Sequence, residues 1–472
     1  MFEKITPQIQ EAIGAIVGPE NLLFGAEKTI DYGHDEFSLR DITRQPDLVV
    51  KPGTEYQVSE VLKLAGERKI PVTPRGGATG LVGGCVPTYG GIVLSLERMN
   101  RILEIDPDNQ MAVVESGLRL SDLATAVDYA GLYFPPHPGD ESAMIGGLVS
   151  TNAGGSRAVK YGTIRNYVRG LEVVCPTGEI LKLGGKFIKS STGYNLMALF
   201  IGSEGTLGVV TKAVIQLITK PALSRSLVVP FAELEQAIDT VPLLLKKGIL
   251  PMAVEFLEIE PIVLAEEYLH LKWPTKMGKT HLLIILDANS EEEMDRLSQA
   301  VADACLEKEA MNIFIAETPS RQDEVLSIRS KIYEAIKAGT VEILDISLPR
   351  AEIAGHVRKV EETARKYDIW LPTFGHAADG NVHTHIMKAR YMNGKMVPVP
   401  QSEWRDKVDK VREELFRDCR ERGGVISGEH GIGLVKKPFL SLVLDEKQID
   451  LMRSIKKAFD PAGIMNPGKI FD

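Results

Sequence analysis

The chain begins with apolar residues at helical spacing. The residues that recur on one side of the expected helix are Ile9, Ile13, Ile16 and Val17. Gly18-Pro19 ends the pattern, because glycine and proline both interrupt a helix. We therefore interpret residues 1–45 as a leading helical arm.

Between Leu48 and Lys220 the apolar residues form short runs typical of strands, with helical stretches between them. Helices are predicted over residues 54–68 and 121–130. The predicted strands are residues 48–50, 70–73, 91–96, 101–106, 111–116, 171–175 and 207–217. Several strands follow one another through Asp-Pro, Asp-Asn or Thr-Gly turns that are too short for a helical crossover, so much of the sheet should be antiparallel. The pattern predicts an α+β domain over residues 46–220 and counts against a simple doubly wound fold.

Beyond Pro221 glycine becomes sparse and longer helical patterns take over, which indicates a domain boundary. A strand is predicted over residues 281–286, and helices are predicted over residues 291–309, 323–338 and 402–422. Helices packed on a mostly antiparallel sheet would form a second α+β domain over residues 221–425. The turn-rich segment 426–472 should return to the first domain.

The amino-acid composition indicates the class of protein but says little about any reaction that the protein catalyses. A chain of 472 residues that is 44% hydrophobic and 25% charged is typical of a globular protein with two or three domains. The net charge of −9 argues against nucleic acid as a partner. The sequence has no signal-peptide pattern and no apolar run near 18 residues, and its four cysteines lie far apart, which excludes a C-x-x-C iron–sulfur ligand set. We expect a cytoplasmic protein, with any membrane association made through a partner.

Residues 74–84 read Pro-Arg-Gly-Gly-Ala-Thr-Gly-Leu-Val-Gly-Gly, with five glycines and no acidic side chain. Glycine tolerates positive φ and lets successive backbone N–H groups approach a phosphate. The loop lies between two predicted strands. It has neither a G-x-G-x-x-G pattern nor a Gly-Lys-Ser/Thr ending, which counts against NAD-type and P-loop sites. Taken alone, it could equally be an ordinary glycine-rich turn.

Three further glycine-rich stretches follow in the same domain. They are Pro-Pro-His-Pro-Gly-Asp at 135–140, Ile-Gly-Gly-Leu-Val-Ser-Thr-Asn-Ala-Gly-Gly at 145–155, and Ile-Gly-Ser-Glu-Gly-Thr-Leu-Gly at 201–208. Close backbone approach at several separated places suits a long ligand such as a dinucleotide better than a single phosphate.

In this order, the motifs resemble the FAD domain of the vanillyl-alcohol oxidase/p-cresol methylhydroxylase superfamily. Motifs nearer the C-terminus are similar to its D-2-hydroxyacid dehydrogenase branch, which includes D-lactate dehydrogenases, D-2-hydroxyglutarate dehydrogenases and the flavin subunit of glycolate oxidase. The resemblance extends from about residue 40 to the end of the chain. It implies an FAD-binding domain followed by a substrate domain.

The resemblance also implies which residues contact FAD. Residues 75–80 would wrap the pyrophosphate, Glu204 and Gly205 would lie near the adenine or ribose, and Asn466 would lie near the flavin. The full set of implied cofactor residues is Pro74, Arg75, Gly76, Gly77, Ala78, Thr79, Gly80, Leu81, Pro138, Gly139, Asp140, Ile145, Gly146, Gly147, Asn152, Gly154, Gly155, Tyr161, Gly162, Glu204, Gly205, Val210 and Asn466. Ala78-Thr79 stand where some relatives place a histidine bonded to the flavin, so noncovalent FAD is expected.

Four of the nine histidines fall between residues 376 and 430. Asp379-Gly380 is a strong two-residue hairpin signal, which would make His376 and His383 cross-strand partners. His385 would share their face. Two imidazoles so placed, with Glu429, could bind a divalent metal such as Zn, Fe or Mn and leave an open position. The alternative is that these histidines only cap a turn and satisfy core hydrogen bonds.

The resemblance matches His376, His383 and Glu429 to metal ligands and His430 to the catalytic base. A bound cation would lower the pKa of a substrate hydroxyl, which makes proton transfer to His430 feasible near neutral pH. His385 stands where a further substrate contact is expected, so it could bind either metal or substrate.

Arg329 is matched by the resemblance to an arginine that binds the substrate carboxylate. A predicted helix places Tyr333 one turn along the same face. Members specific for 2-hydroxyglutarate carry a lysine shortly before a D-x-S-L-P segment, but this chain has Glu342-Ile343-Leu344 before Asp345. The missing cation favours a small monocarboxylate such as D-lactate or glycolate.

The first hypothesis is therefore an FAD- and metal-dependent dehydrogenase of small D-2-hydroxy acids. Since the chain lacks cysteines for its own iron–sulfur relay, electrons should pass to an external acceptor. The resemblance implies an iron–sulfur subunit, an electron-transferring flavoprotein or a quinone. We expect a homo-oligomer or a hetero-complex.

Three alternatives stay open. D-2-hydroxyglutarate could still be the substrate. A non-redox transferase resembling alkylglycerone-phosphate synthase would act on a lipid, although the paired histidines weigh against it. A flavin-binding structural subunit would leave the chemistry to a partner, although the intact candidate ligands weigh against that role.

Overall fold

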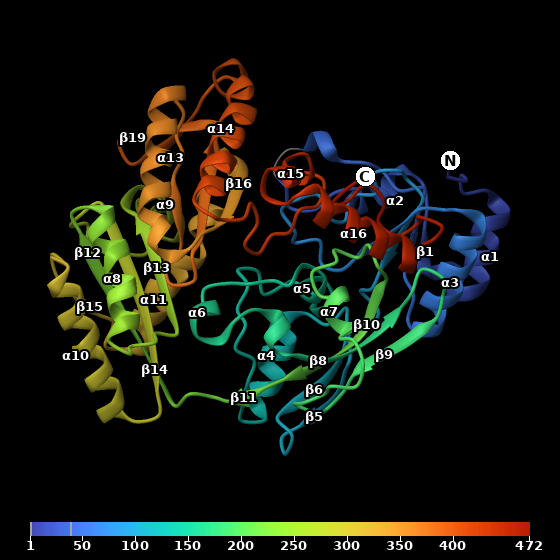
Figure 1. The fold of residues 1–472 in the computed structure, drawn as a ribbon, viewed down its shortest axis with the longest axis horizontal. Coiled ribbons are helices and arrows are strands. Elements are labelled where there is room, and N and C mark those ends of the chain that lie inside the picture. Colours follow the sequence, from blue (N-terminus) through green and yellow to red (C-terminus); the bar gives the residue numbers. More distant parts are fainter. Residues whose placement is uncertain (1, 38–39) are drawn as a thin grey trace. The chain divides into compact units, whose positions relative to one another are not determined.

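The computed structural model describes residues 2–37 and 40–472, and they divide into two compact units (Figure 1). Unit 1 comprises Met1–Gly154, Thr163–Lys220 and Glu429–Asp472, and unit 2 comprises Gly155–Gly162 and Pro221–Gly428. Both contain helices and sheets, which confirms the α+β prediction. Within the described ranges, no helix combines the length and apolarity that a membrane span requires.

Unit 1 begins with helix α1 (Pro7–Val17), as the apolar spacing predicts. The Thr6 side chain caps the helix, because its hydroxyl oxygen accepts the Ile9 N–H at 3.3 Å. Ile13 and Val17 are buried on the inner side of the helix.

The first sheet of unit 1 has the strand order β1 (Leu22–Leu23), β2 (Leu48–Val50), β4 (Ile92–Ser95) and β3 (Val72–Arg75). Strands β2, β3 and β4 are parallel. The expectation of mainly antiparallel pairing is wrong for this sheet, because helix α3 (Glu55–Arg68) is a full crossover between β2 and β3. The glycine loop joins β3 to β4.

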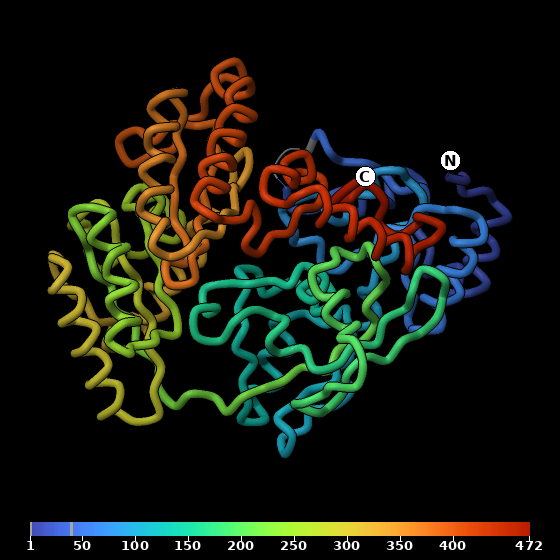
Figure 2. The backbone as a smooth tube through the Cα atoms, viewed as in Figure 1, coloured from blue at the N-terminus to red at the C-terminus, as the bar shows by residue number. Residues whose placement is uncertain are grey.

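The C-terminal segment returns to this sheet. The Val72 N–H donates to the carbonyl of Ile464 at 2.8 Å, and the Asn466 N–H donates to the carbonyl of Val72 at 2.7 Å. Figure 2 shows the red C-terminal segment beside the blue N-terminal part of unit 1. Two ends of the sequence therefore build one side of this unit.

The second sheet of unit 1 is antiparallel throughout. Its strand order is β5 (Ile102–Asp106), β6 (Met111–Glu115), β10 (Val209–Gln216), β8 (Val168–Val174) and β9 (Ile180–Gly184). Short turns join β5 to β6 and β8 to β9, as predicted. Helices α4 (Leu120–Tyr129), α5 (Ile145–Thr151) and α7 (Met197–Phe200) lie in the intervening chain.

Unit 2 contains one seven-stranded sheet in which every pairing is antiparallel. Its strand order is β15 (Phe314–Ile315), β12 (Leu223–Phe231), β14 (Thr280–Ala288), β13 (Ala253–Glu258), β17 (Thr373–His376), β18 (Asn381–Met387) and β16 (Thr340–Ser347). This confirms the mostly antiparallel sheet expected for the second region.

Helices cover both faces of this sheet (Figure 1). Helices α9 (Ile259–Leu269), α11 (Pro319–Ser330) and α12 (Ile332–Ile336) share one apolar core with Phe374 of β17. Helices α8 (Leu234–Lys246) and α10 (Glu291–Glu307) contact the sheet, while α13 (Ile353–Tyr367) and α14 (Gln401–Glu421) pack together. Helix α6 (Ala158–Tyr161) also belongs to unit 2.

The helix predicted over residues 323–338 is two helices. Helix α11 starts earlier, because Pro319 occupies its first turn and the Thr318 hydroxyl accepts the Arg321 N–H at 3.2 Å. The chain leaves helical geometry at Lys331, with φ −99° and ψ 7°. Arg329 and Tyr333 are consequently on different helices, so the expectation that they share a helix face is wrong.

The apolar pattern hides this break. Ile328, Ile332 and Ile336 are all fully buried at continuous helical spacing. The Lys331 N–H ends α11 by donating to the Ser327 carbonyl at 3.1 Å, while the Lys331 carbonyl accepts the Ala335 N–H at 3.0 Å in the next helix.

Candidate functional site

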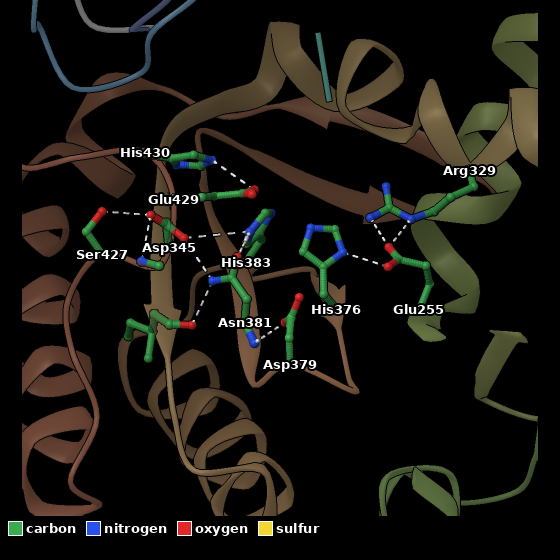
Figure 3. Close-up of polar contacts among 12 residues, drawn as sticks. Glu255, Arg329, Asp345, His376, Asp379, Asn381, His383, Ser427, Glu429 and His430 are labelled. Atoms are coloured by element: carbon green, nitrogen blue, oxygen red, sulfur yellow. Dashed lines mark hydrogen bonds and ion pairs between the residues drawn. The ribbon is translucent and has the colours of Figure 1, made fainter. Parts of the chain in front are cut away.

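One face of the unit 2 sheet brings together polar residues from four strands (Figure 3). Directly opposed residues of antiparallel strands point to the same face, and side chains alternate along each strand. The register of β13, β17, β18 and β16 therefore defines two adjacent rows. The first row is Glu255, His376, Asn381 and Ser347; the second is Leu257, Phe374, His383 and Asp345.

The hairpin between β17 and β18 has a longer loop than predicted. The loop spans residues 377–380, so His376 pairs with Asn381 and His383 pairs with Phe374. The predicted direct pairing of His376 with His383 is wrong. The two histidines are diagonal neighbours on one face, with ring centroids 5.3 Å apart.

Gly380 explains the different hairpin. It has φ +94°, and a Cβ at this position would clash with the carbonyl oxygen of Leu348. The Leu348 N–H also donates to the Gly380 carbonyl at 2.9 Å. Close packing against the chain after β16 therefore requires this glycine, whereas the prediction assigned it to a two-residue turn.

His376 is held by a carboxylate and an arginine. Its Nδ1 lies 2.6 Å from Oε1 of Glu255, and Arg329 binds Oε2 through Nε at 2.7 Å and also through Nη2. Burial alone would raise the pKa of Glu255, but the charges of Arg329 and His376 outweigh burial and lower the pKa to about 2. An ionised Glu255 accepts the Nδ1–H of His376, so Nε2 is the ring nitrogen that could ligate a metal.

Arg329 reaches this network from α11. Its guanidinium carbon lies 5.5 Å from the centre of the Phe374 ring. Glu255 occupies Nε and one hydrogen of Nη2, so a substrate carboxylate would use Nη1 and the second hydrogen of Nη2. The arginine that the resemblance matches to substrate binding is therefore already paired with Glu255 along one edge of its guanidinium.

Asp345 is fully buried and joins three segments of unit 2. Its Oδ1 accepts from Asn381 Nδ2 at 2.8 Å, and its Oδ2 accepts from Ser427 Oγ at 2.9 Å and from the Gly428 N–H at 3.1 Å. His383 Nε2 lies 3.7 Å from Oδ1 of Asp345 and 2.9 Å from Oδ1 of Asn381. Asp345 thus connects β16 and β18 to the chain after α14.

His385 lies one step further along the same face of β18. Its ring stacks on Phe374, with centroids 4.7 Å apart and an angle of 23° between the planes. The Tyr333 ring of α12 is 5.8 Å away. The structure therefore brings His385 and Tyr333 together, although Tyr333 does not share a helix with Arg329.

The residues before Asp345 divide between the two faces of the sheet. Ile343 is directly opposite His385 and shares its face. Glu342 is opposite Ile386, so it lies on the other face, where Arg412 of α14 binds it through Nε at 3.0 Å and through Nη2. Ile343 is therefore the residue that brings an aliphatic side chain to the candidate site.

Glu429 and His430 follow Gly428 directly, and the boundary between the units falls at this peptide bond. His430 Nε2 lies 3.9 Å from Oε1 of Glu429. A Cβ at Gly154 would come within 2.8 Å of Oε2 of Glu429. Room for the Glu429 carboxylate thus explains the glycine at 154, which the sequence associated only with the cofactor.

Glu204 has both carboxylate oxygens bound to backbone. Oε1 accepts the Ile432 N–H at 2.7 Å, and Oε2 accepts the Gly433 N–H at 2.8 Å. Burial raises the pKa of Glu204, while these backbone hydrogen bonds oppose the rise. Asn466 Nδ2 donates to the Glu204 carbonyl at 2.7 Å and to the Gly84 carbonyl at 2.9 Å. The two side chains thus connect three segments inside unit 1.

The glycine loop contains a strained residue. Ala78 has φ +58°, in the left-handed region that side chains other than those of Gly, Asn and Asp seldom adopt. Gly76 and Gly77 pack closely, since their Cβ atoms would lie 3.3 Å from Met144 Cβ and 3.2 Å from the Ser142 carbonyl oxygen. Such strain in a tightly packed loop is typical of a ligand-binding segment.

Two other predicted cofactor glycines face open space. No atom lies within 4 Å of a Cβ built at Gly139 or Gly147. Gly146, the residue before Gly147, differs because a Cβ there would lie 2.7 Å from Ser116 Cβ. Packing therefore requires Gly146, whereas Gly139 and Gly147 leave room for a ligand that passes close to the backbone, as FAD would.

The remaining predicted cofactor residues of unit 1 are divided among its helices, strands and loops. Arg75 ends β3 and donates to the carbonyls of His34 at 2.6 Å and Asp31 at 2.8 Å. Ile145 begins α5, and Asn152 follows it with φ +51°. The others are Pro74, Thr79, Gly80, Leu81, Pro138, Asp140, Gly205 and Val210.

Tyr161 and Gly162 are predicted cofactor residues, yet they belong to unit 2 with the rest of residues 155–162. Asp287 at the end of β14 binds Lys160 Nζ at 2.6 Å and Tyr161 Oη at 2.5 Å. The predicted cofactor residues are therefore distributed over both units.

The donor groups on the histidine face fit a divalent metal. Ring nitrogens of His376 and His383 lie within 4.8 Å of each other, close to the separation of at most about 4 Å that one ion about 2 Å from each would require. Glu255 beside His376 and Asn381 beside His383 orient the rings, as outer partners of metal ligands do.

Sequence reasoning missed Glu255 and gave Asp345 and Asn381 no role. Each carboxylate stands alone within an apolar strand run, Ala253-Val254-Glu255-Phe256-Leu257 and Leu344-Asp345-Ile346. A charged residue in a buried run must be paired, so this interruption was an available signal.

Comparison with known proteins identifies the family of this chain. A family profile described as "FAD binding domain" matches residues 46–184, and one described as "FAD linked oxidases, C-terminal domain" matches residues 220–470. A D-lactate dehydrogenase of Archaeoglobus fulgidus is 44% identical over 90% of this chain and 91% of its own length. The glycolate oxidase subunit GlcD of Bacillus subtilis is 36% identical over 99% of this chain and 97% of its own length.

A solved structure of p-cresol methylhydroxylase with substrate bound has the same fold. The match covers 100% of this chain and 99% of the p-cresol methylhydroxylase chain, with a TM-score of 0.81 and 19% sequence identity. The fold of the vanillyl-alcohol oxidase/p-cresol methylhydroxylase type is therefore confirmed.

Proposed function

Because the chain belongs to the FAD-linked oxidase family, we propose that it is an FAD- and divalent-metal-dependent dehydrogenase that oxidises D-lactate or glycolate to the 2-oxo acid. Relatives named D-lactate dehydrogenase and glycolate oxidase support a small 2-hydroxy acid as substrate. The observation that carries the proposal is the histidine face, where His376 and His383 lie together, each with a polar partner that orients it.

His376, His383 and Glu429 are the proposed metal ligands. A divalent cation bound there would lower the pKa of the substrate hydroxyl. Glu255 accepts the Nδ1–H of His376 and so directs Nε2 toward the ligand position. Glu429 is peptide-bonded to Gly428, whose N–H binds Asp345, and this continuity holds the third ligand to the same network.

His430 is the proposed base that removes the hydroxyl proton. An imidazole is suited to this transfer because its ordinary pKa lies near neutral pH. Noncovalent FAD, bound by the glycine loop and the motifs at 138–162, would accept the hydride from Cα of the substrate. Tyr161 and Gly162 would complete the cofactor site from unit 2.

Substrate selection is assigned to Arg329, Tyr333 and His385. Arg329 would bind the carboxylate through Nη1 and the second hydrogen of Nη2, while Glu255 holds the other edge of the guanidinium. The stacking of His385 on Phe374 beside Tyr333 supports a substrate contact over metal ligation. Ile343 on the same face offers no cation to a second carboxylate, which favours D-lactate or glycolate over D-2-hydroxyglutarate.

Electrons are proposed to leave for an iron–sulfur subunit, an electron-transferring flavoprotein or a quinone. The free cysteines Cys85 and Cys175 belong to unit 1 and Cys305 and Cys419 to unit 2, and no candidate metal-ligand group of the described residues contains a cysteine. We place the protein in the cytoplasm, at a membrane only through such a partner, and as a homo-oligomer or hetero-complex.

Anaerobic titration of the purified FAD protein tests this function. D-lactate, glycolate and D-2-hydroxyglutarate are added separately with Zn²⁺, Mn²⁺ or Fe²⁺ present, and the flavin absorbance is followed near 450 nm. Bleaching by D-lactate or glycolate that a chelator abolishes and metal restores is the expected result. If no hydroxy acid bleaches the flavin with any metal, the dehydrogenase proposal is wrong.

A further inference from the structure

The segment of residues 427–433 contains Glu429 and His430 and starts in unit 2. There Asp345 binds both Ser427 and Gly428, through a side-chain hydroxyl at 2.9 Å and a backbone N–H at 3.1 Å. The Gly428 N–H also lies 3.1 Å from the carbonyl oxygen of Asp345. The first end of the segment is therefore fixed to β16 by one fully buried residue.

The same segment ends in unit 1, where Glu204 takes the corresponding role. Its two oxygens accept the N–H groups of Ile432 and Gly433 at 2.7 and 2.8 Å. Glu204 is 9% exposed and has φ +51°, so both its side chain and its backbone are constrained. Its own N–H donates to the Ser150 carbonyl at 2.8 Å.

Glycines 431 and 433 allow the chain to approach Glu204 and the glycine loop. A Cβ at Gly431 would lie 3.0 Å from Oε1 of Glu204, and a Cβ at Gly433 would clash with the Val82 carbonyl oxygen. The Val82 carbonyl also accepts the Leu434 N–H at 2.9 Å. Hydrogen bonds and close packing thus fix the second end of the segment within unit 1.

Between these two attachments the segment contains only Glu429, His430 and Gly431. We propose that Asp345 and Glu204 are positioning residues, each fixing one end of residues 427–433 and together setting where Glu429 and His430 stand. The inference rests on the proposed function for the roles of Glu429 and His430. It gives Glu204 a role distinct from the expected contact near the adenine or ribose.

A carboxylate suits this role because it offers two acceptor oxygens to two donors. In Glu204→Gln or Asp345→Asn, one oxygen becomes an NH2 group that faces another donor. The side-chain shape is kept while at least one hydrogen bond is lost. Loss of an orienting partner of this kind commonly lowers activity or metal affinity by about 10- to 100-fold.

Hydrogen–deuterium exchange of the FAD-loaded protein tests the attachment without relying on activity. Exchange is measured in peptides that cover residues 427–433. Glu204→Gln should speed exchange at Ile432 and Gly433 by at least about tenfold, and Asp345→Asn should do the same at Gly428. Unchanged exchange in both variants would overturn the attachment itself, whatever the substrate of the protein.

Two matched variants control for the loss of any buried carboxylate. Glu115 in unit 1 is 1% exposed and accepts the Arg101 N–H at 2.8 Å, and Glu266 in unit 2 is 4% exposed and accepts the Trp273 N–H at 2.8 Å. Glu115→Gln and Glu266→Gln should leave exchange at 427–433 unchanged.

The catalytic consequence is measured as flavin reduction by D-lactate. Glu204→Gln and Asp345→Asn should lower kcat by about 10- to 100-fold while FAD content and KM change less than about threefold. Faster exchange with unchanged kcat, or an equal kcat loss in the two controls, would overturn the positioning role. A wild-type protein that no hydroxy acid reduces would instead refute the proposed function and leave the exchange result standing.

Discussion

The glycine loop of unit 1 and the histidine face of unit 2, the proposed cofactor and metal sites, are built from different parts of the chain. The loop relies on backbone, with a left-handed Ala78 and with room at Gly139 and Gly147 in the motifs that follow it. The face relies on ionisable side chains, such as His376 and Glu255, that strand register brings together. The first arrangement depends on backbone conformation and space, and the second depends on pairs of side chains, so substitutions should affect the two regions differently.

Removing a side chain from the histidine face should have the largest effect. His383→Ala should slow flavin reduction by D-lactate at least about 1,000-fold, or about 4 kcal/mol in the barrier, because a proposed metal ligand is lost. FAD should stay bound, since the loop in unit 1 is untouched. Stopped-flow reduction and the flavin-to-protein absorbance ratio measure the two results. Loss of FAD would show that the two regions are not separate in function.

His281 provides a contrast within the same sheet. The Trp273 indole N–H donates to its Nδ1 at 2.8 Å, so the proton must be on Nε2, which donates to the Met277 carbonyl at 2.8 Å. Burial lowers the pKa of His281 from 6.5 to about 4. This histidine has a structural role, because both ring nitrogens form hydrogen bonds inside unit 2.

The sign of its effect on stability follows from that lowered pKa. Between pH 6.5 and 4 the unfolded chain binds the proton and the folded chain does not, so stability falls as the pH drops through this window. The contribution is about 3 kcal/mol. Denaturant unfolding at several pH values should show that His281→Gln removes this part of the acid sensitivity. An unchanged pH slope would mean that His281 is not kept neutral by the fold.

The adjacent glycines Gly146 and Gly147 of unit 1 differ in their surroundings. Gly146 is closely packed, whereas a Cβ at Gly147 would enter open space. Gly147→Val should weaken FAD binding by about 2 kcal/mol, or roughly 30-fold, because the side chain enters open space near the backbone. Gly146→Ala should instead lower the melting temperature, because its Cβ meets Ser116. Flavin fluorescence titration and thermal unfolding distinguish the two. Equal effects of both substitutions on melting alone would remove the argument for a cofactor cradle.

The smallest predicted effect concerns substrate choice on the histidine face. Ile343→Lys should raise kcat/KM for D-2-hydroxyglutarate relative to D-lactate by about tenfold, or about 1.4 kcal/mol, by pairing with a second carboxylate. Ile343→Met is the neutral control of similar size. If the lysine variant keeps the wild-type ratio, Ile343 does not face the bound substrate.

Much of the fold was predictable because its signals are local. The strand runs, the helix at α1 and the short turns of the five-stranded antiparallel sheet in unit 1 follow from apolar spacing and turn residues. The parallel first sheet was missed because pairing direction depends on where α3 returns the chain. The break at Lys331 was missed because buried isoleucines continue the helical spacing across it.

The candidate site was less predictable because its geometry is tertiary. A two-residue turn at Asp379-Gly380 was a sound expectation, but contact with Leu348 sets the loop and shifts the register. Glu255 lies far along the chain from His376, so only the register of β13 with β17 shows that they meet. Motif spacing identifies candidate ligands, while the partners that orient them depend on strand order.

Residues 155–162 belong to unit 2 although unit 1 segments lie on both sides of them in the sequence, and this has a consequence for recombination of the gene. The described chain passes between the units at 154/155, 162/163, 220/221 and 428/429. A gene fragment encoding 221–428 would therefore leave behind Lys160 and Tyr161, the partners of Asp287. A fragment that carried all of unit 2 would have to span residues 155–428, and it would bring residues 163–220 of unit 1 with it.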